Sequence, residues 1–161
     1  MTEYLRNVDE SVARNDRESL RRLDRVVLAD VKTVWAQYQS TRDRSAIYAY
    51  LHMVFMQVDW WINNPDEQKQ EIDAFRAQNP AVSLPIDDYA AVIVCTADPK
   101  KVDDKTRSKW SRVLRYAAEY KPQKELLRDF LQRKGGINQC AARYGRRLGR
   151  SAKRKAGSRQ P

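Results

Sequence analysis

The segment 43–62 limits the possible folds more than any other part of the chain. Its core reads IYAYLHMVFMQVDWWI, and a helical repeat gathers five apolar residues on one face: Ile47, Leu51, Val54, Val58 and Trp61. Tyr50, Met53 and Trp60 lie elsewhere around the same helix. A helix that is apolar on several sides has to be covered on several sides. We therefore expect the preceding helix to cover one side. The middle segment or a second copy of the chain, in a homodimer formed through residues 43–62, would cover the others.

The residues before this segment also predict a helix. Six apolar residues repeat there at gaps of three and four: Leu20, Leu23, Val27, Val31, Val34 and Tyr38. This stripe predicts one helix from about Asp16 to Tyr38. Ser40 and Asp43 then have the spacing of a capping box, which predicts that the next helix begins between them.

Residues 64–98 predict two shorter helices. Asn64 and Pro65 suit the N-cap and first position of a helix that runs to about residue 77. The segment 87–97 is ambiguous, because its β-branched residues favour a strand while its leading Asp pair and its alanines favour a helix. No second strand-like run exists to pair with it, and an isolated strand would leave its backbone hydrogen bonds unmade. We predict a buried helix and an all-α protein.

Charge divides the chain into two unlike parts. The net charge is +10, but residues 1–98 hold 11 Lys/Arg and 16 Asp/Glu, whereas residues 99–161 hold 20 and 5. The balances are therefore −5 and +15. Such asymmetry indicates a C-terminal part that binds a polyanion and an N-terminal part with another role.

The basic part predicts two helices followed by a Gly pair. Residues 103–120 place an apolar set inward, namely Trp110, Val113, Leu114 and Ala117, and a basic set on another side, namely Lys105, Lys109 and Arg112, with Tyr116. Pro122 ends this helix. A second one carries a compact apolar patch: Leu126, Leu127, Phe130 and Leu131. Gly135 and Gly136 end that helix and allow a left-handed turn.

The segment after the glycines is both basic and amphipathic. One side is predicted to be buried: Ile137, Ala141, Tyr144 and Leu148. The opposite side carries Gln139, Arg143, Arg146, Arg147 and Arg150. Together with the preceding helix and the glycine turn, it forms a helix-turn-helix-like unit. The usual helix-turn-helix pattern has a small residue early in its first helix and a single Gly in the turn. An alternative frame puts Ala141 and Gly145 at those two positions, but it would need a second helix from RRLGRSAKRKAGS, which has almost no apolar stripe.

A helix of this kind suits the DNA major groove, where Arg contacts guanine and Gln or Asn contacts adenine, while other cations contact phosphate. Asn138 suits an N-cap better than a base contact. The tail from residue 149 has no hydrophobic anchor and is expected to be disordered alone. It is either a solvated or localisation-like cluster, or an arm that follows the phosphates. The candidate DNA-binding residues are Lys105, Lys109, Arg112, Lys134, Asn138, Gln139, Arg143, Arg146, Arg147, Arg150, Lys153, Arg154 and Lys155.

These patterns predict an acidic helical core with a self-association role at 1–98, a basic DNA-binding module at 99–148 and a disordered tail at 149–161. The preferred function is a sequence-preferring double-stranded DNA-binding protein, either a transcriptional regulator or a plasmid or phage accessory protein. One alternative is an RNA-binding protein in which Trp110, Tyr116 and Tyr120 stack on bases, although no standard RNA module is visible. Another is an adaptor with an acidic protein partner.

An enzyme is the least supported class. The chain has one His, no Gly-rich phosphate loop, no nucleophile motif and no metal-ligand cluster. His52 and Asp59 lie on one side of the apolar helix, and we interpret them as core polar groups satisfied by partners such as Arg21 or Arg25 rather than as a catalytic pair.

The remaining features predict a cytoplasmic protein without cofactor or metal. No apolar run approaches the roughly 18 residues of a membrane span, and the N-terminus lacks the apolar core of a signal peptide. Cys95 and Cys140 lack metal-ligand spacing and are expected to be free thiols.

Overall fold

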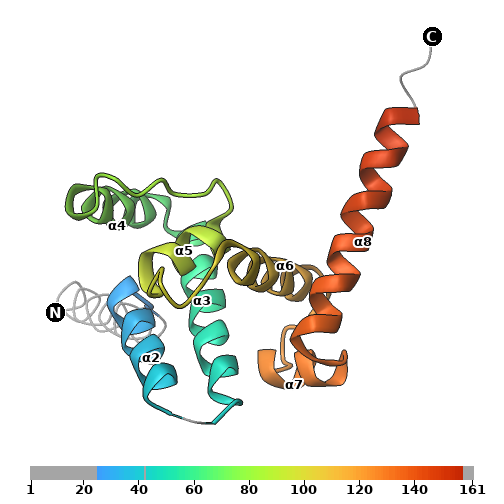
Figure 1. The fold of residues 1–161 in the computed structure, drawn as a ribbon, viewed down its shortest axis with the longest axis horizontal. Coiled ribbons are helices and arrows are strands. Elements are labelled where there is room, and N and C mark those ends of the chain that lie inside the picture. The colour runs from blue at the N-terminus through green and yellow to red at the C-terminus, as the bar shows by residue number, and fades with distance from the viewer. Residues whose placement is uncertain (1–24, 42, 158–161) are drawn as a thin grey trace, which may run out of the picture.

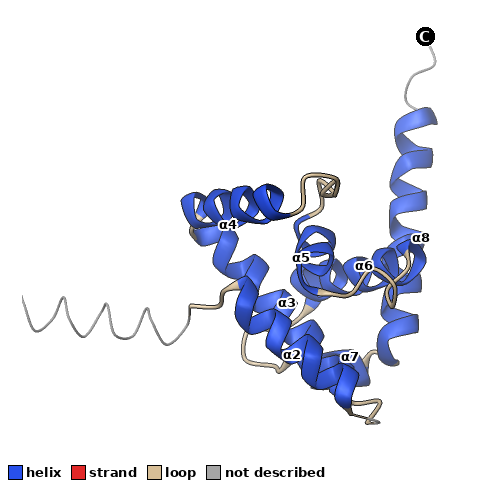
Figure 2. Ribbon diagram, turned by 60° about the vertical axis from the view of Figure 1, so that its left-hand side comes forward, coloured by secondary structure: helices blue, strands red, loops and turns tan. Residues whose placement is uncertain are grey.

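The computed structural model describes residues 25–41 and 43–157. These residues form helices joined by loops and turns, with no strand among them, as Figure 2 shows. The seven helices are α2 (Leu28–Ser40), α3 (Ala46–Asn63), α4 (Pro65–Gln78), α5 (Asp88–Thr96), α6 (Asp104–Tyr120), α7 (Leu127–Arg133) and α8 (Gly136–Gly157). The predicted all-α class is confirmed for this part of the chain, and the ambiguous segment 87–97 is helical.

Helix α3 lies at the centre of the fold, as its sequence requires. Its buried residues are Ile47, Tyr50, Leu51, Val54, Gln57, Val58 and Trp61. Helices α2, α4, α5, α6 and α7 all contact it, so the chain itself covers several sides of the apolar helix (Figure 1). The homodimer through residues 43–62 stays a prediction.

The N-terminal helix differs from the predicted one. Leu20 and Leu23 lie outside the described residues, and residues 25–27 are not helical, so the predicted unbroken helix to Tyr38 is wrong. Val27 is extended, with φ −122° and ψ 157°. Its backbone N–H donates to Asp30 Oδ2 at 3.1 Å. This hydrogen bond starts α2 at Leu28 and separates it from the residues before it.

The link between α2 and α3 also differs from the predicted capping box. Ser40 is the last residue of α2, and its hydroxyl donates to the Gln37 carbonyl at 2.9 Å. Asp43 accepts hydrogen bonds from the Ser45 backbone N–H at 2.8 Å and from the Ser45 hydroxyl at 2.6 Å. Asp43 therefore stabilises the loop before α3 and does not lie in the first turn of a helix. Helix α3 begins at Ala46.

His52 and Asp59 are exposed, so their interpretation as core polar groups is wrong. Both are outside the buried stripe of α3 that contains Leu51 and Trp61. Arg25 pairs with Glu67 at 3.2 Å instead, and Arg21 lies outside the described residues. The error arose because the helix is apolar on most sides but still has one polar, solvent-facing side.

A cap on α5 joins it to the basic part of the chain. The Asp87 carboxylate accepts from the Ala90 backbone N–H at 2.8 Å and from the Ser111 hydroxyl at 2.9 Å. It also pairs with Arg115 Nε at 2.8 Å. One carboxylate thus caps α5 and fixes the middle of α6 beside it. This arrangement connects the acidic N-terminal part to α6, on which α8 packs.

Candidate nucleic-acid interface

Helix α8 is buried at its beginning and exposed beyond its middle. Cys140, Ala141 and Tyr144 are buried, and Ile137 is half-buried against the core. Leu148, the fourth residue of the predicted buried stripe, is 47% exposed, so that part of the prediction is wrong. The apolar spacing continues through Leu148, but the C-terminal part of α8 extends past the rest of the fold (Figure 1).

The turn before α8 requires its two glycines. Gly135 and Gly136 have φ of 92° and 85°, the left-handed region that favours glycine. A Cβ on Gly135 would also lie 3.1 Å from Gln139 Cγ. Helix α7 ends at Arg133 and α8 begins at Gly136, which gives two helices joined by a tight turn. Because α8 is continuous through Gly145, the alternative frame that placed a new helix after it does not describe this chain.

Helices α6 and α8 pack together more extensively than any other described pair. Lys109 Nζ donates to Asn138 Oδ1 at 3.4 Å across this junction. Asn138 lies within the first turn of α8 rather than at its N-cap, so the predicted capping role is wrong. Arg112 is half-buried beside Gly145, where an added Cβ would lie 3.1 Å from Nη1. Only Lys105 among the three basic α6 candidates is exposed.

The outer side of α8 carries the densest positive charge. Gln139, Arg143, Arg146, Arg147 and Arg150 are all exposed. Arg147 pairs with Glu119 of α6, and its guanidinium carbon lies 5.5 Å from the centre of the Tyr120 ring. Within the described ranges, no carboxylate lies within 4 Å of the guanidinium groups of Arg143, Arg146 or Arg150. These three side chains can therefore bind an anion without first breaking an ion pair.

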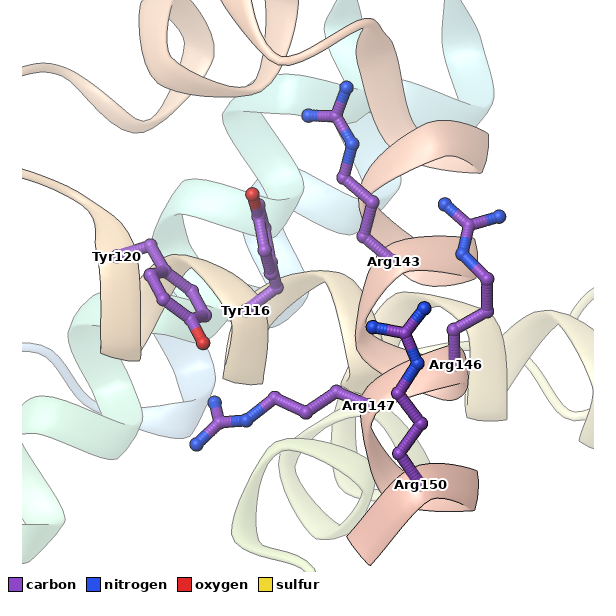
Figure 3. Close-up of a pocket in the computed structure, with 6 residues that line it drawn as sticks. All are labelled: Tyr116, Tyr120, Arg143, Arg146, Arg147 and Arg150. Atoms are coloured by element: carbon purple, nitrogen blue, oxygen red, sulfur yellow. The ribbon is translucent and has the colours of Figure 1, made fainter.

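Two tyrosines lie beside these arginines. A pocket of about 480 Å³ is lined by Tyr116, Tyr120, Arg143, Arg146, Arg147 and Arg150. Figure 3 shows the tyrosines on α6 and the arginines on α8, with Arg147 reaching toward Tyr120. Sequence reasoning placed Tyr116 on the basic side of residues 103–120 but did not include either tyrosine among the candidate DNA-binding residues. Arg112, Tyr116 and Tyr120 follow one another at intervals of four residues, which puts them on one side of a helix. This spacing was the signal in the sequence that could have indicated the pocket.

The predicted tail is partly helical. Lys153, Arg154 and Lys155 fall in the last turns of α8, which runs to Gly157, although the sequence predicted disorder from residue 149. Residues 158–161 lie outside the described residues. Lys134, the remaining basic candidate, is half-buried at the C-cap of α7 and is not part of α8.

Cys95 and Cys140 are free and buried, and burial raises the pKa of the Cys95 thiol to about 12. Within residues 25–41 and 43–157, no three His, Cys, Asp or Glu side chains are grouped so as to hold a metal ion. None of the described helices is long and apolar enough to cross a membrane.

Two glycines in α8 offer a direct test of how its exposed half is ordered. A Cβ on Gly149 would meet nothing within 4 Å, whereas one on Gly145 would press on Arg112. Since Gly in a helix costs about 1 kcal/mol relative to Ala, Gly149→Ala should slow amide hydrogen exchange in residues 149–157 by up to about fivefold. The Gly145→Ala substitution should slow this exchange less. Equal gains would show that Arg112 does not occupy the space beside Gly145.

Comparisons with protein-family models, with curated proteins and with solved structures give no significant match. The function of this surface is therefore inferred from its own residues.

Proposed function

We propose that the chain binds double-stranded DNA, with a sequence preference, through the arginine-bearing side of α8. The observation that carries this proposal is a set of three guanidinium groups that have no carboxylate partner among the described residues, those of Arg143, Arg146 and Arg150. They lie on a helix that extends past the rest of the fold. A polyanion is the ligand that such a set of fixed cations favours. The balance of +15 in residues 99–161 supports the same class of ligand.

The dimensions of α8 suit the major groove. With 22 residues the helix is about 33 Å long, and the groove, about 12 Å wide, admits an α-helix. After Tyr144, Gly145 lies beside Arg112 and Arg147 contacts Glu119 and Tyr120 of α6. The turns beyond these contacts extend past the rest of the fold, so they can enter the groove without rearrangement of the core. Arginines within the groove contact guanine, and those at its edges contact phosphate.

This docking would differ from that of a usual helix-turn-helix protein. There, the first residues of the second helix contact the bases. In this chain the first turns of α8 are packed on α6 and α7, so its exposed second half would dock instead. The helix-turn-helix-like connection at Gly135 and Gly136 would then serve to direct α8 away from the core.

The proposed biological role is a cytoplasmic transcriptional regulator or a plasmid or phage DNA-binding accessory protein, and not an enzyme. Residues 1–98 would mediate self-association in this role. A homodimer with two such helices would contact two half-sites about one helical turn apart.

Titration against duplex DNA over a range of salt concentrations tests the proposal. Each phosphate contact contributes about −0.9 to the slope of log affinity against log salt. Contacts from Arg143, Arg146 and Arg150 therefore predict a slope of about −2.7 or steeper. Duplex RNA and a DNA duplex of random sequence are the controls. A sequence preference predicts that a preferred DNA duplex is still bound more tightly than the random one at high salt. Binding that is independent of salt, or stronger to duplex RNA, would refute the proposal.

A further inference from the structure

The pocket between α6 and α8 combines two kinds of side chain that duplex docking alone does not need. Tyr116 and Tyr120 form one wall, with ring centres 4.9 Å apart and planes 39° from each other. Arg143, Arg146, Arg147 and Arg150 form the other. Duplex DNA presents phosphates on its outside and stacks its bases inside. Its phosphates could meet the arginines and the tyrosine hydroxyls, but the faces of the tyrosine rings would have no base to stack on.

We propose that this pocket binds an unpaired nucleotide, with the base against Tyr120 and the phosphate among the arginines. The inference rests on the proposed function, since it assigns a further ligand to the same arginines. Aromatic side chains next to cations along one groove are the pattern by which proteins hold single-stranded nucleic acid. The volume of about 480 Å³ lies within the range of small-molecule sites, about 300–1,000 Å³.

The two tyrosines contribute differently to this site. Tyr116 is half-buried and packs on Phe130, with ring centres 5.8 Å apart. These contacts fix the position of its ring in the wall of the pocket. Tyr120 is the last residue of α6 and is 47% exposed, so a base can stack on it.

Arg147 is positioned by two contacts and therefore has a different role from its neighbours. It pairs with Glu119 and lies 5.5 Å from the Tyr120 ring centre. Glu119 and Tyr120 are adjacent on α6, so one arginine is held against both. Arg147 thus orders the Tyr120 side of the pocket, and Arg143, Arg146 and Arg150 are left to bind phosphate.

Tyr120→Ala in the full chain tests the site, with fluorescence anisotropy on a short single-stranded DNA and on a blunt duplex. Base–aromatic stacking predicts a loss of about 10-fold or more for the single strand and an unchanged affinity for the duplex. Tyr120→Phe keeps the stacking ring and should restore single-strand binding. Because Tyr120 is half exposed at a helix end, its replacement is not expected to unfold the chain, and far-UV circular dichroism verifies this.

A nucleoside triphosphate, added as a competitor of the single strand, distinguishes the two sources of such a nucleotide. Competition that depends on Tyr120 indicates a free nucleotide, whereas binding of the single strand alone indicates an unpaired segment of DNA. The proposed pocket is overturned if neither the nucleoside triphosphate nor the single strand binds. It is also overturned if Tyr120→Ala lowers the affinities for single strand and duplex equally. If the unaltered chain bound the single strand but not the duplex, the proposed function would be refuted and the proposed pocket would stand.

Discussion

Replacement of Arg143, Arg146 and Arg150 together by alanine is expected to lower the affinity for duplex DNA several hundred-fold at about 0.1 M salt. A contact with a slope of about −0.9 contributes about eightfold at 0.1 M relative to 1 M salt, and three contacts multiply. The slope itself should become shallower by about 2.7. All three side chains are exposed and have no carboxylate partner within the described chain. Their removal should therefore leave the folded structure intact.

The control for this variant removes the same charge elsewhere. Three exposed cations in the acidic part of the chain serve for this: Lys32, Arg44 and Arg76. Replacing them by alanine changes the net charge equally. Arg76 lies 3.9 Å from Asp73, so the control also loses one exposed ion pair, which contributes little to stability. Similar losses in both would mean that the chain attracts DNA by its total charge and that α8 is not the docking surface.

Single replacements within this set separate base contacts from phosphate contacts. A side chain that contacts a base should weaken binding to a preferred site more than to a random one, whereas a phosphate contact should weaken both alike. Arg143 lies nearest the packed half of α8 and Arg150 farthest from it, so their comparison also indicates how deeply the helix enters the groove.

The sequence predicted the features of this fold that depend on local patterns. The apolar circumference of residues 43–62 predicted a helix that is covered on several sides, and α3 is contacted by five other helices. Asn64 and Pro65 predicted the start of α4, and the Gly pair predicted a left-handed turn, which the positive φ of Gly135 and Gly136 confirms. In each case the determining residues are neighbours in the chain, so their spacing contains the information.

Features that depend on contacts between distant segments could not be predicted in this way. Leu148 continues an apolar repeat, yet it is exposed, because burial depends on whether another part of the fold reaches that position of the helix. His52 lies on a strongly apolar helix, yet it faces solvent. The pocket required Tyr120 and Arg147 to meet, and only the packing of α6 on α8 brings them together.

The two adjacent tryptophans of α3 provide the second large expected effect. Trp61 is fully buried, and its indole N–H donates to Glu71 Oε2 at 2.7 Å. Trp60 is half-buried, and its indole N–H donates to Glu67 Oε2 at 3.0 Å. Both bond a carboxylate of α4, so the pair matches in residue type, helix and hydrogen bond and differs mainly in burial.

Trp61→Ala is expected to lower the free energy of unfolding by about 3–5 kcal/mol, because it leaves a cavity at the centre of the core. Trp60→Ala should cost about 1 kcal/mol, as is usual for a partly exposed site. Urea unfolding followed by far-UV circular dichroism measures both. A total stability of about 5–15 kcal/mol leaves Trp61→Ala marginally folded, so Trp61→Phe, which keeps an aromatic ring, is the version to use if the alanine variant does not fold.

The Trp61 variant also tests whether stability and DNA binding are separable in this chain. Trp61 is fully buried, whereas the proposed docking surface lies on the exposed half of α8. Below its unfolding transition, the destabilised protein should therefore bind duplex DNA with nearly unchanged affinity. If the affinity instead fell in parallel with stability in both Trp61→Ala and Trp61→Phe, the arginines would depend on the central core for their placement. The α6–α8 pair could then not be regarded as a rigid support in itself.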